Sequence, residues 1–139
     1  MKRILLDTNI VLDVLLERKP YVDASAVVWT AVETGGAEGM LAAHAVTTIH
    51  YLIRKEMGNA KSGRIVSAIL RVFRVAAVDG EVIRQALELP VSDFEDAVTA
   101  AAAGLAGCEY IVSRDTRGFR GSSIPSLTPE AVMPLLHGE

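Results

Sequence analysis

The 139-residue sequence has few aromatic side chains, 5% of the total, and a single cysteine, Cys108. One cysteine excludes an internal disulfide and argues against a zinc site built on cysteines. With so few aromatics the core has to consist mainly of Ala, Val, Leu and Ile, which suit helices packed on a buried parallel sheet. No apolar run reaches the roughly 18 residues of a membrane-spanning helix, so no membrane association is expected.

A net positive charge is also lacking, since 17 acidic residues face 14 basic ones. This balance disfavours a protein that coats nucleic acid. It does not disfavour a nuclease, because carboxylates that bind a metal add negative charge that the cation offsets. Asp7 interrupts the first apolar stretch too early for a signal peptide, so we expect a cytoplasmic protein. The length fits one domain over residues 1–139.

Short apolar runs alternate with stretches of helical periodicity along the chain. The runs predict strands at residues 4–6, 40–43, 72–78, 110–113 and 124–127. The periodic stretches predict helices at residues 10–18, 22–33, 44–57, 60–70, 81–89 and 93–105, and a last one opened by Thr128-Pro129-Glu130. This alternation predicts an α/β fold with a parallel sheet covered on both faces.

Two aspartates follow predicted strands directly: Asp7 comes after residues 4–6, and Asp115 after residues 110–113. Ligands of open α/β sheets bind in the crevice outside the carboxyl ends of the strands. If these two strands are neighbours, both aspartates face one crevice. The alternative for each is a turn residue that hydrogen-bonds nearby backbone.

A third acid, Asp96, lies at the start of the predicted helix 93–105. Ser92 and Glu95 have the spacing of a capping box, and we assign Glu95 to that role. Asp96 differs because positions 96, 100, 103 and 107 are Asp, Ala, Ala and Gly. Such small residues let the helix lie close to the sheet, which would hold Asp96 at the sheet's edge. Asp93, one turn earlier, can join from the same side.

Three or four clustered carboxylates repel one another unless a cation or a proton lies between them. Ligands that are all oxygen suit Mg²⁺ or Mn²⁺ rather than zinc. A metal ion held there can orient and deprotonate a water for attack on phosphorus. The sequence therefore predicts a magnesium or manganese site.

The chain resembles the PIN domain family in three segments: Ile-Leu-Leu-Asp-Thr-Asn at 4–9, Asp-Phe-Glu-Asp-Ala at 93–97, and Tyr-Ile-Val-Ser-Arg-Asp at 110–115 followed by Phe119. The resemblance implies a three-layer α/β/α fold with a mainly parallel sheet of about five strands. It also implies an Mg²⁺- or Mn²⁺-dependent ribonuclease acting on RNA. Asp7, Asp96 and Asp115 match its catalytic metal ligands, and Thr8 and Asn9 the supporting polar residues. Small members are often VapC-like toxins that pair as homodimers and are neutralised by an antitoxin protein.

Two positions depart from the family pattern. The family has a glutamate on the helix after the second strand, where His50 is the nearest match here, and many members have a further acid where this chain has Thr116-Arg117-Gly118. His50 shares a helical face with Val46 and Ile53, so it either packs beside the core or reaches the metal or the scissile phosphate. Asp93 would compensate as a fourth ligand.

Arg114 and Arg117 flank Asp115 and either hold the RNA backbone or belong to a solvated loop. The leading hypothesis is a metal-dependent endoribonuclease, the toxin of a toxin–antitoxin pair. The alternative is a catalytically weak or inactive PIN-like domain that binds RNA or a protein partner. A response-regulator-like domain also has aspartates at strand ends, but the lysine expected at the end of a late strand is missing.

Overall fold

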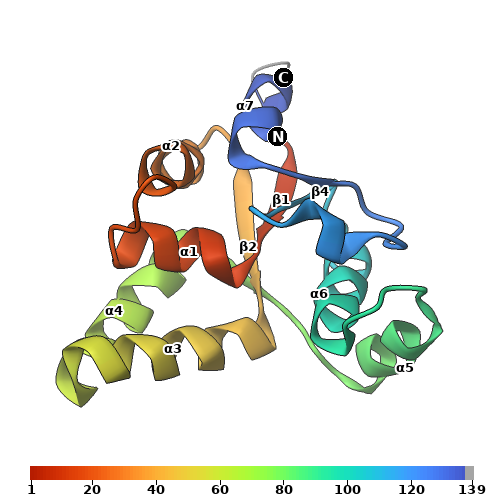
Figure 1. Cartoon of the computed structure of the whole chain (residues 1–139), viewed down its shortest axis with the longest axis horizontal. Helices are drawn as coiled ribbons and strands as arrows, with labels where there is room; N and C mark the ends of the chain where they lie inside the picture. The colour runs from red at the N-terminus through yellow and green to blue at the C-terminus, as the bar shows by residue number, and fades with distance from the viewer. Residues whose placement is uncertain (137–139) are drawn as a thin grey trace.

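A computed structural model describes residues 1–136, which fold around a single five-stranded parallel sheet (Figure 1). The strands lie in the order β3-β2-β1-β4-β5. Their bounds are β1 Arg3–Leu6, β2 Glu38–Ala42, β3 Arg74–Ala76, β4 Tyr110–Val112 and β5 Ser126–Leu127. The helices are α1 Thr8–Leu15, α2 Val22–Glu33, α3 Ala43–Met57, α4 Asn59–Val72, α5 Gly80–Glu88, α6 Phe94–Leu105 and α7 Pro129–Leu136, with a short 3₁₀ helix, η1, at Thr116–Phe119.

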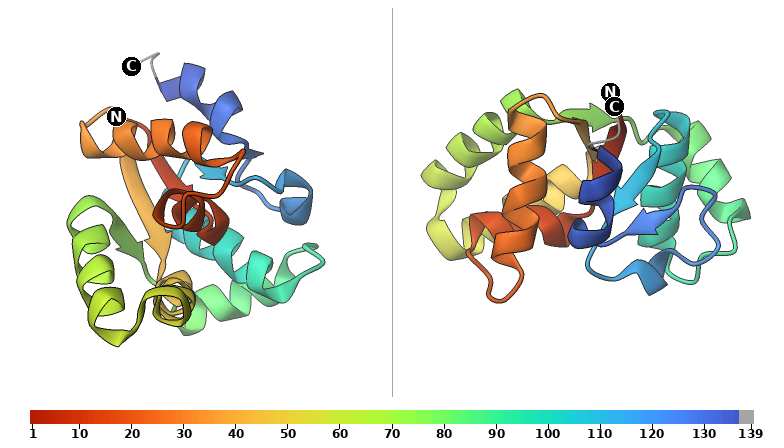
Figure 2. Two further views of the ribbon diagram at one scale, coloured as in Figure 1. Left: turned by 60° about the vertical axis from the view of Figure 1, so that its left-hand side comes forward. Right: turned by 90° about the horizontal axis from the view of Figure 1, so that it is seen from above.

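Helices cover both faces of this sheet, which gives the predicted three-layer α/β/α fold (Figure 2). Along β1, Leu5 points into the core shared with α5 and α6, while Ile4 and Leu6 point into the core shared with α1, α2, α4 and α7. This alternation is the two-residue period of a strand that is buried on both faces. The fold prediction is confirmed.

The alanine-rich sequence of α6 explains how closely this helix lies on the sheet. Ala97 and the run Ala100–Ala103 are all buried. The predicted stripe of small residues is correct for Ala100 and Ala103, but not for Gly107. The helix ends at Leu105, and Gly107 has a φ of +77°, so it reverses the chain after the helix rather than extending the stripe.

Some helices and strands begin or end at other residues than predicted, and others agree. Helix α1 begins at Thr8 rather than Ile10, because Asp7 is its N-cap. The last helix begins at Pro129 as predicted, with the Ala131 N–H donating to Thr128 Oγ1 at 3.2 Å. The predicted strand 72–78 shrinks to three residues because α4 continues through Val72.

Within residues 1–136, no helix is both long and apolar enough to cross a membrane. Residues 137–139, the end of the predicted domain, lie outside the described part of the chain.

Candidate functional site

Asp7 and Asp115 reach the same edge of the sheet because β1 and β4 are adjacent. The two strands pair in parallel with Leu6 opposite Val112, and the Asp7 N–H donates to the Val112 carbonyl at 2.9 Å. The two segments therefore leave the sheet side by side at its carboxyl edge, where α/β proteins bind ligands. The sequence predicted a shared crevice for Asp7 and Asp115 if their strands were neighbours. The strands β1 and β4 are neighbours.

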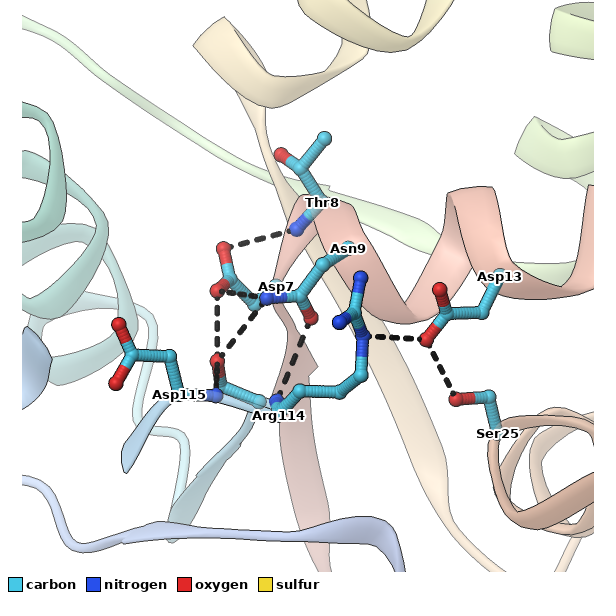
Figure 3. A network of polar contacts seen from close by, with 8 residues as sticks. Asp7, Thr8, Asn9, Asp13, Ser25, Arg114 and Asp115 are labelled. Carbon is cyan, nitrogen blue, oxygen red and sulfur yellow. Dashed lines mark hydrogen bonds and ion pairs between the residues drawn. The ribbon is translucent and has the colours of Figure 1, made fainter. Parts of the chain in front are cut away.

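The carboxylate of Asp7 is fixed by three donors. Asp7 Oδ2 accepts from Ser113 Oγ at 2.8 Å and from Asn9 Nδ2 at 3.3 Å, and Oδ1 accepts from the Thr8 N–H at 2.9 Å (Figure 3). Thr8 thus contributes its backbone and Asn9 its side chain. Both predicted supporting residues contact Asp7.

Sequence reasoning missed Ser113, which it treated as the last residue of a strand. Strand β4 ends at Val112, and the buried Ser113 hydroxyl donates to Asp7 and accepts from the Asp115 N–H at 3.1 Å. One hydroxyl therefore ties two of the predicted metal ligands together. The available signal was a hydroxyl residue directly after a buried strand and two positions before an aspartate, a spacing that favours side chain–backbone bonding.

Asp96 and Asp115 converge beside Gly118 of η1. A Cβ on Gly118 would lie 3.0 Å from Asp96 Oδ2 and 3.4 Å from Asp115 Oδ2. The missing side chain thus leaves space onto which carboxylate oxygens from α6 and from the segment after β4 both face. A pair of oxygens around such a space suits a hard divalent cation.

The electrostatics of the acids agree with this convergence. Burial raises the pKa of Asp96 to about 6, and the nearby charges of Asp7, Asp93, Glu95 and Asp115 add to the effect. Burial also raises the pKa of Asp7, an effect larger than that of the hydrogen bonds from Ser113 and Thr8, which lower it, and the charges of Glu95 and Asp115 add smaller contributions upward. Each carboxylate is therefore held near others that it repels, an arrangement that a cation would stabilise.

The acids lie near one another, but they do not form a ready metal-binding group. Among residues 1–136, no three His, Cys, Asp or Glu side chains stand in a group close enough to hold a metal ion. The structure therefore does not assemble Asp7, Asp96 and Asp115 into one ligand set, and the set stays a prediction.

The sequence suggested Glu95 as a helix-capping residue and Asp93 as a metal ligand, but Asp93 is the residue that caps α6. The predicted capping box on Ser92 is wrong: Asp93 is the N-cap of α6, and its Oδ1 accepts from the Asp96 N–H at 3.0 Å. Glu95 does not cap α6, because this helix begins one residue later than a cap at Ser92 requires. Its charge, like that of Asp115, contributes to the raised pKa of Asp7.

His50 lies against α4, where its Nε2 is 3.4 Å from the buried Ser62 Oγ. His44, six residues earlier on α3, faces α6 instead, with its Nε2 3.2 Å from Thr99 Oγ1. At 100° per residue these histidines occupy different sides of the helix. The structure therefore supports the interpretation of His50 as a packed side chain and does not bring it to the aspartates.

Arg114 pairs with a buried acid on α1. Its Nε lies 2.8 Å from Oδ2 of the fully buried Asp13 (Figure 3). Its guanidinium carbon is 3.9 Å from the ring centroid of Tyr21. The sequence did not suggest this ion pair or its buried partner Asp13, and the role of Arg114 in RNA binding stays a prediction. Arg117 is exposed on η1, and its role in RNA binding stays a prediction.

The parallel sheet covered by helices on both faces, with acids at its carboxyl edge, places the chain in the α/β class. The chain belongs to the PIN domain family, whose model matches residues 3–117, so the predicted family is confirmed. No curated protein matches the sequence.

Several solved structures share the fold. FitAcB from Neisseria gonorrhoeae is 20% identical over 91% of this chain and 98% of its own, with a TM-score of 0.71. VapC20 from Mycobacterium tuberculosis, a toxin that cleaves the sarcin-ricin loop, is 19% identical over 91% and 99%, also at 0.71. DNA-bound VapBC from Salmonella typhimurium is 16% identical over 93% and 99%, at 0.70. At these identities the similarity establishes the fold alone.

Proposed function

We propose that this protein is a divalent-metal-dependent endoribonuclease, the VapC-like toxin of a toxin–antitoxin pair. The observation that carries the proposal is that three acids from separate elements, Asp7, Asp96 and Asp115, lie near enough for their charges to act on one another. Asp7 is fixed at the end of β1, and oxygens of Asp96 and Asp115 face one space beside Gly118. Carboxylates that repel one another at the ligand-binding edge of a sheet are suited to Mg²⁺ or Mn²⁺.

In this proposal Asp7, Asp96 and Asp115 are the metal ligands. Ser113 and Asn9 orient Asp7 through the bonds they donate to its Oδ2. The metal, when bound, supplies a polarised water for attack on phosphorus and offsets charge on the leaving oxygen. Asp93 keeps its capping bond and adds negative charge beside Asp96 rather than serving as a ligand. Arg117, exposed next to Asp115, contacts the RNA backbone.

The partners of this function are RNA, an antitoxin protein and a second copy of the chain, in the cytoplasm. VapBC complexes among the structural neighbours support the antitoxin. Support for the homodimer comes from the apolar surface of α2 and α7, which lie side by side (Figure 2). Val27 is 51% exposed there, and a groove of about 440 Å³ runs past Val27, Thr30, Thr34 and Met133.

The test is cleavage of single-stranded RNA by purified protein with Mn²⁺ or Mg²⁺, with a chelator, and with the variants Asp96→Asn and Asp115→Asn. Cleavage should need the metal and fall by at least about tenfold in each variant, since a charged ligand contributes 1.4 kcal/mol or more. Binding of RNA without cleavage would favour the second candidate, an inactive PIN-like domain. The substitution of His50 for the family glutamate is the observation behind that candidate.

A further inference from the structure

We propose that the buried Asp13–Arg114 ion pair positions Asp115 for metal binding, which makes both residues positioning groups of the site. This inference rests on the proposed function, because it assumes the metal site proposed above. The contacts of the ion pair do not depend on that assumption. Arg114 directly precedes Asp115, and the two side chains leave the loop in opposite directions, Arg114 toward α1 and α2 and Asp115 away from them (Figure 3).

The Arg114 side chain has two contacts, with Asp13 and with Tyr21, and Ser25 holds Asp13 in turn. Its Nε lies 2.8 Å from Asp13 Oδ2, an electrostatic contact whose alignment falls short of a hydrogen bond. Ser25 Oγ donates to the same oxygen at 3.2 Å, which connects the pair to α2. Tyr21 covers the guanidinium, whose carbon lies 3.9 Å from the ring centroid. Because Asp13 is fully buried, the pair cannot exchange its partner for water without moving the loop.

On the side of the loop that faces α1, its backbone contacts side chains that surround Asp7. The Asp115 N–H donates to Ser113 Oγ at 3.1 Å, and the Arg114 N–H approaches Asn9 Oδ1 at 3.5 Å. The second of these contacts is long, so the ion pair is the principal restraint on the α1 side of the loop. Asp115 itself is exposed and has no side-chain capping bond. Its carboxylate therefore depends on the loop for its position.

Charge alone predicts a different result from positioning. If charge is all that matters, removing a cation alone beside an acidic site should tighten Mn²⁺ binding, and removing one charge of each sign should leave it unchanged. Loss of a positioning contact weakens it, by about 10–100-fold for groups that orient metal ligands. The double variant Asp13→Leu/Arg114→Met removes one charge of each sign and fills the site with apolar side chains, a replacement that buried ion pairs often tolerate. Ser25 can then donate to the carbonyl one turn earlier in α2.

The experiment compares wild type with this double variant, with Arg114→Lys, and with Arg120→Met, a control that removes an exposed cation from the same segment. Two quantities are measured: hydrogen exchange of residues 113–119 without metal, and Mn²⁺ affinity by calorimetry. We expect several-fold faster exchange and at least tenfold weaker Mn²⁺ binding in the double variant, an intermediate effect for Arg114→Lys, and no loss of affinity for Arg120→Met.

Wild-type exchange and wild-type affinity in a double variant of unchanged melting temperature would overturn the proposal. If the double variant melts early, Arg114→Lys decides: exchange that rises at 113–119 but not in β1 supports positioning, and a uniform rise refutes it. A wild type that binds no Mn²⁺ contradicts the proposed function, while the metal-free exchange comparison still decides the role of the ion pair.

Discussion

The Ser113 hydroxyl lies 2.8 Å from Asp7 Oδ2 and also accepts the Asp115 N–H, so one buried side chain holds two acids that are far apart in the sequence. Both acids reach the edge of the sheet on their own, because each follows its own strand. Ser113 fixes their orientation relative to each other. A residue that orients a metal ligand commonly changes metal affinity by about 10–100-fold when it is replaced.

Ser113→Ala should therefore weaken Mn²⁺ binding by about tenfold or more. It should also raise the pKa of Asp7 further, since the hydrogen bond from Ser113 opposes the effect of burial. Calorimetric titration measures the affinity. The matched control is Ser62→Ala, another fully buried serine, which bonds the Asn59 carbonyl in α4. Equal loss of affinity in both variants would show a general effect of destabilisation rather than a role of Ser113.

The raised pKa of Asp96 predicts how stability depends on pH without metal. Between the unfolded value of 3.8 and the folded value of about 6, the folded protein binds more protons than the unfolded one. This contribution to stability is therefore fully present below 3.8 and is lost as pH rises through about 6. Glu38 has a lowered pKa and acts in the opposite direction, so the comparison has to be made against Asp96→Asn.

Thermal melting from pH 3 to 8 in chelator should show wild type losing stability relative to Asp96→Asn across this window, roughly pH 4–6. Saturating Mn²⁺ should reverse the loss in wild type, because the cation favours the ionised carboxylate. A difference between the two proteins that does not change with pH would contradict the raised pKa.

Gly118→Ala should interfere with the metal site directly. The added methyl would lie 3.0 Å from Asp96 Oδ2 and 3.4 Å from Asp115 Oδ2, so one or both oxygens must move. We expect Mn²⁺ affinity to fall by about tenfold, an outcome comparable to the loss of an orienting group. Gly63→Ala is the control, since a Cβ there meets nothing within 4 Å and sits in a helix, where it should stabilise. Unchanged affinity in Gly118→Ala would mean that the cation does not bind between Asp96 and Asp115.

His50→Glu tests whether the family glutamate can be restored at this position. Because His50 faces the buried Ser62 on α4, the new carboxylate should lower the melting temperature, by roughly 2–4 °C for each kcal/mol, without tightening Mn²⁺ binding. Thermal melting and calorimetry on the same samples measure both. Tighter Mn²⁺ binding with an unchanged melting temperature would contradict this expectation and show that the side chain at position 50 reaches the metal site.

The parts of the fold and site that the sequence predicted are those with local causes. A buried strand followed by an aspartate can be recognised from a short stretch of sequence, and the alanines of α6 indicate that this helix packs closely on the sheet. The site residues that sequence patterns did not reveal depend on tertiary contacts instead. Ser113 meets Asp7 across 106 positions of sequence, and Arg114 meets Asp13 from a loop that local patterns describe equally well as solvated.

The two histidines of α3 also show that local sequence patterns do not reveal tertiary contacts. Helical periodicity correctly groups His50 with Val46 and Ile53, but it does not reveal which neighbour that face meets. His44 and His50 are six residues apart on α3 and point to different sides of the helix, so His44 contacts α6 and His50 contacts α4. The packing of α3 against these two helices decides which of them each histidine meets.

The central claim is that Asp7, Asp96 and Asp115 form one divalent-metal site. Calorimetric titration of Mn²⁺ into the wild type and into Asp7→Asn, Asp96→Asn and Asp115→Asn tests it most directly. We expect the wild type to bind Mn²⁺ and each substitution to weaken binding by at least about tenfold, because each removes a charged oxygen ligand worth 1.4 kcal/mol or more. Wild-type affinity in any of the three folded variants, or no binding by the wild type, would contradict the claim.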